Sequence, residues 1–351
     1  MQDVSGKLVN VTSGVVLTAM IGWLLIVGQG LLMPIVIAVI LVYILTTAAE
    51  ALGRVPGVGA LPRGLRLLLV GVLSLAAAVY LISLTMYNAG EIVASLPEYS
   101  QNLQSLVNQT SRLLGLEAVP SVSAMLDEIT GVLDLSKIAG IVATGLSGAG
   151  TFFVTALLYV MFLLSEWNDL PGKIRRALQD DEARIDTTLN TLGQISERIG
   201  GYLTTKTLIN VILAGVSYAC MWLIGIDYAV FWAIWIGLLN YIPYIGSALG
   251  VLFPVALTLA QFGTLGHAAA AFVSLMAAQL VVGNVLEPRM LGKSVNMSAF
   301  VVLAALAFWM AIWGVIGAIL AIPLTSMVMI ILAELPGTRP VAVMMSGDGD
   351  V

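Results

Sequence analysis

Charge is scarce in this sequence of 351 residues. Only 10% of the residues are charged, against roughly 25% in an ordinary soluble domain, whereas 59% are hydrophobic and the mean hydropathy is +1.01. A water-soluble globule is excluded because too few charged side chains remain to cover its surface. The net charge is −5 and the 15 Lys and Arg residues are scattered, which excludes a nucleic-acid surface.

Side chains that carry catalytic or metal chemistry are also scarce. Cys220 is the only cysteine and His267 the only histidine, which excludes intrachain disulfides, cysteine metal clusters, Ser-His triads and HExxH zinc sites. The LGKS stretch at Leu291–Ser294 is not a phosphate loop, because Glu287 stands where the first glycine would be. We therefore expect no enzymatic activity, no cofactor and no bound metal.

What the chain has in abundance is apolar runs, and about 20 such residues suffice to cross a bilayer. They predict an all-α polytopic integral membrane protein with amphipathic external and cytoplasmic helices between its spans. The predicted segments are three N-terminal spans (1–90), an external amphipathic segment (91–137), a fourth span (138–165), cytoplasmic amphipathic helices (166–206), a membrane region with two broken-helix hairpins (207–335) and a tail (336–351). The polar GDGD stretch at Gly347–Asp350 predicts a disordered end.

Lys and Arg residues indicate the orientation, because cytoplasmic loops retain positive charge. They follow the second span, the fourth span and the long run that begins at Tyr228, whereas segment 91–137 is mainly acidic. We expect both termini in the cytoplasm and segment 91–137 outside. The number of crossings after Asp227 stays open between short full spans and hairpins that re-enter the membrane.

Proline and glycine interrupt two apolar runs in the second half. LNYIPYIGS at Leu239–Ser247 contains Pro243 and Gly246, and GVIGAILAIPLT at Gly314–Thr325 contains Pro323. Proline removes an amide donor and clashes with the preceding turn, and the freed backbone groups cannot face lipid. The breaks favour either a solute site or kinks that shape helix packing, in equal measure.

The polar side chains in these runs are mostly uncharged. They would suit a small hydroxylated solute, although hydrogen bonds between helices are their more common use. Charged residues lie at the ends of the runs, so no coupling carboxylate stands out at mid-membrane. Glu287 and Arg289 could pair across Pro288. The uncharged set is Asn210, Ser217, Asn240, Gln279, Asn284 and Ser298.

Three motifs, taken in order, carry a family resemblance. YLTTKT (Tyr202–Thr207) with LNYIPYIGS, then GNVLEPRMLGKS (Gly283–Ser294), then WGVIGAILAIPLT (Trp313–Thr325) resemble the autoinducer-2 exporter family, also called PerM-type permeases. The resemblance implies about eight spans in the bacterial inner membrane, a homo-oligomer of the pentameric kind and an elevator-like motion. It places Asn240, Pro243 and Gly246 in a first hairpin, Glu287, Pro288 and Arg289 between hairpins, and Gly314, Gly317 and Pro323 in a second.

Three functional hypotheses follow. The first is a secondary transporter of a small polar solute, with the resemblance pointing to the quorum-sensing signal autoinducer-2. The second is a sodium or lithium/proton antiporter, and the third is a non-transporting scaffold that recruits partners through its Ile185–Tyr202 face. The expected substrate path is Asn240, Pro243, Gly246, Asn284, Gly314, Gly317 and Pro323, and the expected gating or coupling residues are Glu287, Pro288, Arg289 and Asp227.

Overall fold

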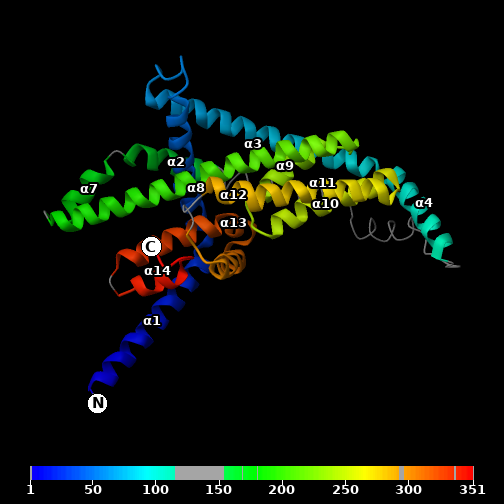
Figure 1. Cartoon of the computed structure of the whole chain (residues 1–351). Helices are drawn as coiled ribbons and strands as arrows, with labels where there is room; N and C mark the ends of the chain where they lie inside the picture. Colours follow the sequence, from blue (N-terminus) through cyan, green and yellow to red (C-terminus); the bar gives the residue numbers. More distant parts are fainter. Residues whose placement is uncertain are drawn as a thin grey trace. The chain divides into compact units, whose positions relative to one another are not determined.

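The computed structural model describes residues 2–114, 154–167, 169–179, 181–291, 296–335 and 337–350 (Figure 1). Its regular elements in these ranges are all helices, and six stretches are long and apolar enough to cross a membrane. The prediction of an all-helical, multi-pass membrane protein is confirmed, and the count of eight spans stays a prediction. The six are α2 (Gln29–Leu52), α3 (Arg63–Ala94), α8 (Glu182–Ile224), α10 (Ile245–Phe262), Leu265–Leu291 and α13 (Ala299–Glu334).

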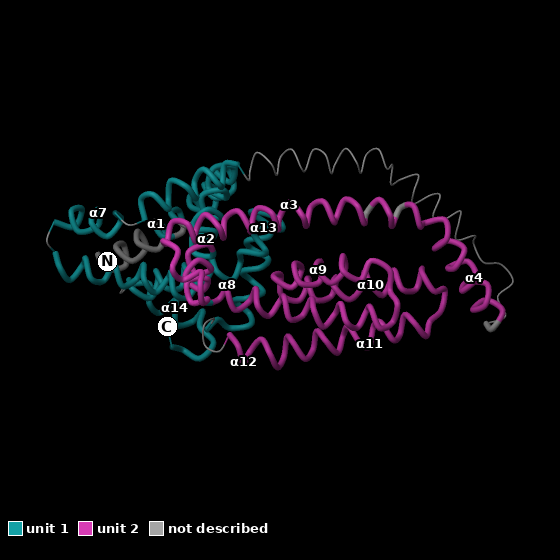
Figure 2. The backbone as a smooth tube through the Cα atoms, turned by 90° about the horizontal axis from the view of Figure 1, so that it is seen from above, with its two compact units in different colours: residues 1–44, 149–201, 295–351 teal, residues 45–148, 202–294 magenta. Residues whose placement is uncertain are grey.

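The chain divides into two compact units, which are coloured separately in Figure 2. Unit 1 comprises residues 1–44, 149–201 and 295–351, and unit 2 comprises residues 45–148 and 202–294. Residues 115–153 hold the second half of the predicted external segment and the start of the predicted fourth span, and they lie outside the described residues. The six predicted segments are defined by their position relative to the membrane, whereas the two units are defined by contacts within the protein. The six segments therefore stay a prediction.

Unit 1 contains a helix, α13, that reverses direction. The elements of unit 1 are α1 (Gln2–Val27), the start of α2, the helix Val154–Trp167, α7 (Leu170–Ala177), the start of α8, α13 and α14 (Arg339–Met345). Within α13, Gly314 has φ 62° and ψ −145°, a combination close to the region that essentially only glycine adopts. A Cβ atom on Gly317 would lie 2.0 Å from the carbonyl oxygen of Trp309, so the two arms pack with their backbones in contact.

The C-terminal segment is ordered, and the prediction of a disordered end is wrong. Asn296 donates to the Asp350 carbonyl at 2.9 Å and to the Asp348 carboxylate, and its own side-chain oxygen accepts from Gly347 N–H at 3.2 Å. The Ser298 N–H donates to the Met345 carbonyl at 3.0 Å. The polar tail is ordered because it forms hydrogen bonds with Asn296, which lies just before α13 and about 50 residues upstream. Composition alone does not show these contacts.

Unit 2 is a layer of antiparallel helices that continue from the second part of α8. Ile209 and Leu213 of α8, Ile236 of α9 (Ala229–Leu239) and Leu275 of α11 (Leu265–Val281) are buried in its core. Residues 240–244 join α9 to α10, and Gly263 and Thr264 join α10 to α11. The 11 residues of α9 span about 16 Å, roughly half the hydrocarbon thickness of a bilayer. The chain therefore breaks within the apolar run where Pro243 and Gly246 predicted a break.

Candidate functional site

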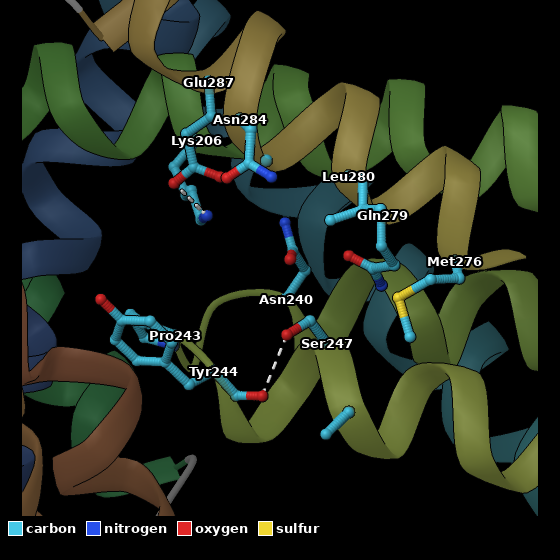
Figure 3. A pocket seen from close by; sticks show the side chains of 12 residues that line it. Lys206, Asn240, Pro243, Tyr244, Ser247, Met276, Gln279, Leu280, Asn284 and Glu287 are labelled. Atoms are coloured by element: carbon cyan, nitrogen blue, oxygen red, sulfur yellow. Dashed lines mark hydrogen bonds and ion pairs between the residues drawn. The ribbon is translucent and has the colours of Figure 1, made fainter.

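A cavity of about 500 Å³ lies within unit 2 (Figure 3). Its size falls in the range of roughly 300–1,000 Å³ that is typical of small-molecule sites. Five elements contribute side chains to its wall: α8, the 240–244 turn with the start of α10, α11, the π-helical turn η1 (Val282–Leu286) and α12 (Glu287–Leu291). The polar lining residues are Lys206, Asn240, Tyr244, Ser247, Gln279, Asn284 and Glu287.

The 240–244 turn forms one wall and holds a strained backbone. The Ile245 N–H donates to the Pro243 carbonyl at 2.7 Å, which closes a three-residue turn around Tyr244. Tyr244 has φ 62° and ψ −56°, close to the rare and strained classic γ-turn. Gly246 follows against the turn, and a Cβ atom there would lie 1.7 Å from the Leu239 carbonyl oxygen, so no larger residue fits.

Asn240 joins the turn to α8 through a buried amide pair. Its Nδ2 donates to Asn210 Oδ1 at 2.8 Å, and both side chains are buried. The side-chain oxygen of Asn240, Oδ1, is a hydrogen-bond acceptor, and Asn240 lines the cavity. Among the residues that the structure describes, two buried amide nitrogens, Asn210 Nδ2 and Gln279 Nε2, have no hydrogen-bond partner. Gln279 lines this cavity, whereas Asn210 does not. Such groups are costly to bury alone, so water or a ligand is their natural partner.

Lys206 and Glu287 form an ion pair at one end of the cavity. Lys206 Nζ lies 2.6 Å from Glu287 Oε1, and the two side chains are 3% and 25% exposed (Figure 3). The predicted pairing of Glu287 with Arg289 is wrong, because residues two apart on a helix such as α12 do not face each other. Pro288 and Arg289 are exposed and do not line the cavity, and in the described ranges Arg289 forms no ion pair.

The helix opposite the turn is interrupted by one π-helical turn. Gly283 and Asn284 lie in η1, between α11 and α12, and both line the cavity. Single π turns inserted into α-helices are rare and are frequent at functional sites. No proline lies within this turn, and Pro288 follows it in α12.

Asp227 lies in a different place from the cavity. Tyr99 Oη of α4 (Leu96–Leu114) donates to Asp227 Oδ2 at 3.0 Å, and the Asp227 N–H donates to Gln261 Oε1 at 2.9 Å. Burial, together with the hydrogen bond to Asp227, raises the pKa of the Tyr99 phenol. Asn102 Nδ2 donates to the Gln261 carbonyl at 2.7 Å. These contacts join α4 to Asp227, in the connection between α8 and α9, and to Gln261, near the C-terminal end of α10. The predicted topology assigns Tyr99 and Asp227 to the same side of the membrane.

The structure thus gathers part of the predicted site. Asn240, Pro243, Asn284 and Glu287 line one cavity, and Gly246 supports its turn. Gly314 and Gly317 form the reversal of α13 in unit 1. Pro323 lies in the second arm, where the helix continues, so the predicted break at Pro323 is wrong.

Sequence reasoning missed Lys206 and Tyr244. Lys206 is one of the positive charges that follow the predicted fourth span and indicate the orientation. Its side chain is nevertheless buried, because it continues the three-four spacing of Ile199, Tyr202 and Ile209 on α8. That spacing was the available signal for its burial. For Tyr244 the sequence offers no signal of its unusual backbone conformation.

Membrane-spanning helices that break around a polar cavity define a polytopic membrane protein of the transport class. The sequence profile of the AI-2E family transporters matches residues 13–337, so the chain belongs to this family. Its relatives are transport proteins, and the chain is not an enzyme.

Individual relatives match along most of the chain. The AI-2 transport protein TqsA of Escherichia coli strain K12 is 27% identical over 344 residues, which are 95% of this chain and 96% of TqsA. YhhT of the same strain is 28% identical over 297 residues, 81% of this chain and 80% of YhhT. A relative from Haemophilus influenzae is 29% identical over 307 residues, 83% of each chain.

Proposed function

We propose that this protein is a secondary transporter that moves a small polar solute, most specifically autoinducer-2, out across the bacterial inner membrane. The observation that carries the proposal is the cavity of about 500 Å³ at the break between α9 and α10. The name of TqsA, an AI-2 transport protein, supports the choice of solute. Cytoplasmic termini, a homo-oligomer and an elevator-like motion of the membrane region belong to the same proposal.

The chemistry of the cavity wall suits a hydroxylated solute. Asn240, Gln279 and Asn284 supply amides and Ser247 supplies a hydroxyl, all of which pair with sugar-like hydroxyl groups. A site that hydrogen-bonds solute hydroxyls discriminates strongly against analogues that lack them, because its own polar groups would then stay unpaired. We therefore expect deoxygenated analogues of the furanosyl signal to compete poorly.

The antiporter remains the second candidate because a carboxylate, Glu287, lines the cavity. The nearby ammonium of Lys206 already neutralises this carboxylate and repels a second cation. The scaffold hypothesis has less support. Ile185, Ile195 and Ile199 of the face expected to recruit partners are buried against the protein's own chain.

The test is flux into liposomes that contain only the purified protein, with labelled autoinducer-2, an internal pH dye, and a sodium gradient present or absent. We expect saturable solute flux that does not depend on sodium. Asn240→Leu should abolish this flux while leaving assembly intact. The matched control is Asn190→Leu, the same change at an exposed position of α8, which should leave flux unchanged.

Two outcomes would count against the proposal. Full activity of Asn240→Leu would remove Asn240 from the path. Sodium-driven proton movement without solute flux would make the protein an antiporter.

A further inference from the structure

The cavity contains a fixed positive charge. Among the described residues of its wall, Lys206 is the one base and Glu287 the one acid. Lys206 is 3% exposed, and its Nζ lies 2.6 Å from Glu287 Oε1. Removing both charges from water is costly, and their attraction offsets this cost only while the pair stays intact. A buried pair of this kind contributes little net stability, so a functional role is the better explanation for its place at a solute site.

The position of Lys206 on α8 keeps the ammonium in place. Its neighbours on the same face, Tyr202, Ile209 and Asn210, are buried, so the stem of the lysine is enclosed by packed side chains. A lysine ammonium is a compact point charge, unlike the broad planar guanidinium of arginine. It resembles a monovalent metal ion in charge and in its preference for oxygen partners.

Side chains with oxygen atoms that suit a cation line the same cavity as the pair. Asn284 lies three residues before Glu287 and lines the same cavity, as does Asn240, whose amide nitrogen is used by Asn210. Figure 3 shows Asn284, Glu287 and Lys206 at the same end of the cavity. Carboxylates, amide carbonyls and carbonyls of interrupted helices are the ligands that hold sodium in membrane transporters.

We propose that Lys206 is a built-in cation that occupies Glu287, and that its removal uncovers a monovalent cation site made by the Glu287 carboxylate with the amide oxygens of Asn284 and Asn240. The proposal deepens the transport function proposed above, on which it rests for its physiological meaning. Its consequence is that the wild-type protein needs no coupling sodium, whereas a variant without the ammonium requires one.

A stability measurement tests the cation site without any transport. The thermal midpoint of the purified full chain is measured in sodium chloride and in choline chloride at equal ionic strength, because a ligand that binds only the folded state raises the midpoint. Lys206→Met should gain several degrees in sodium relative to choline. The wild type and the double variant Lys206→Met/Glu287→Gln should show no such difference.

A second lysine provides the matched control. Lys173 Nζ lies 2.8 Å from Glu166 Oε2, but the two side chains are 55% and 69% exposed. Lys173→Met removes the same kind of pair outside the cavity and should show no sodium response. An equal response in this variant would overturn the proposal, as would the absence of a response in Lys206→Met.

Lys206→Met leaves a partly buried carboxylate unpaired and so risks misfolding. Lys206→Gln, which keeps a hydrogen-bond donor for Glu287, is therefore tested in parallel. Should both single variants stay unfolded in sodium while the double variant folds, sodium does not bind Glu287 and the proposal is overturned.

Flux separates this proposal from the proposed function. Wild-type protein that carries no autoinducer-2 would overturn the proposed function and leave the sodium-specific stability shift as an independent result. Solute flux by the wild type that depends on sodium would confirm transport and overturn the role of Lys206. Under our proposal only the Lys206→Met variant acquires sodium dependence, and Lys206→Arg, which restores the charge, does not.

Discussion

Trp309 Nε1 donates a hydrogen bond to Thr325 Oγ1 at 3.0 Å, although 16 residues separate them in sequence. An uninterrupted α-helix would hold these positions about 24 Å apart. Both side chains are buried, so the bond fixes the register between the two arms of α13. The sharp reversal at Gly314 makes this contact possible.

Replacing Gly314 with alanine should destabilise unit 1. The backbone there lies near a region that costs a residue with a Cβ atom about 1–3 kcal/mol, and no neighbouring atom blocks the new methyl group. We expect a lower thermal midpoint for Gly314→Ala in detergent. Gly215→Ala, at an exposed α-helical position of α8 with open space around it, should be neutral or stabilising. Equal midpoints for the two variants would contradict the strain at Gly314.

The Asn210–Asn240 pair should show energetic coupling. Each single change to alanine removes the 2.8 Å hydrogen bond and leaves its partner buried without it, at a cost of about 1–3 kcal/mol. Because the two changes break the same bond, the double variant should lose less than the sum of the singles. Denaturant unfolding of the three variants in micelles measures this coupling, and strict additivity would show that the pair contributes nothing.

Alkaline pH should weaken the contact between α4 and the end of the hairpins. The pKa of Tyr99 is raised in the folded state, so its neutral form contributes stability that is fully present below tyrosine's ordinary pKa of about 10 and is lost as the pH rises above that value. The thermal midpoint of the wild type should therefore fall more steeply above pH 10 than that of Tyr99→Phe. Tyr87→Phe, which alters an exposed tyrosine, should follow the wild type.

The ordered C-terminal segment should depend on Asn296. This side chain makes contacts with Gly347, Asp348 and Asp350, and its loss in Asn296→Ala should cost about 1–2 kcal/mol and speed proteolysis within residues 346–350. Met344→Ala, at an 82% exposed position of α14, serves as the control. Unchanged protease resistance of Asn296→Ala would mean that packing of α14 alone holds the segment.

Much of the fold was predictable because its signals are local. Apolar runs without charges predict spans, and Pro243, Gly246 and Gly314 predict breaks, since each acts on its own backbone. The site was predictable where it depended on the same signals: Asn240 stands beside the break that Pro243 and Gly246 predict. Asn284 was predictable as an uncharged polar residue in an apolar run. Membership of the family was predictable from three motifs read in order.

What the sequence could not supply depends on contacts between distant residues. Glu287 pairs with a lysine 81 positions upstream, so counting nearby charges led to Arg289. The acidic tail is ordered by Asn296, which composition alone cannot show. The rule that orients the chain by its Lys and Arg residues assumes that each positive charge lies in water. That assumption fails for Lys206, whose side chain is buried.

The left-handed backbone at Tyr244 has a consequence for how this protein tolerates change. A bulky residue is an uncommon choice there, and glycine would adopt the same φ with less strain. Tyr244 thus places an aromatic ring at the cavity wall in a backbone conformation that residues with a Cβ atom rarely adopt. Directed evolution for heat resistance should therefore select glycine at this position, because glycine relieves the backbone strain of the turn.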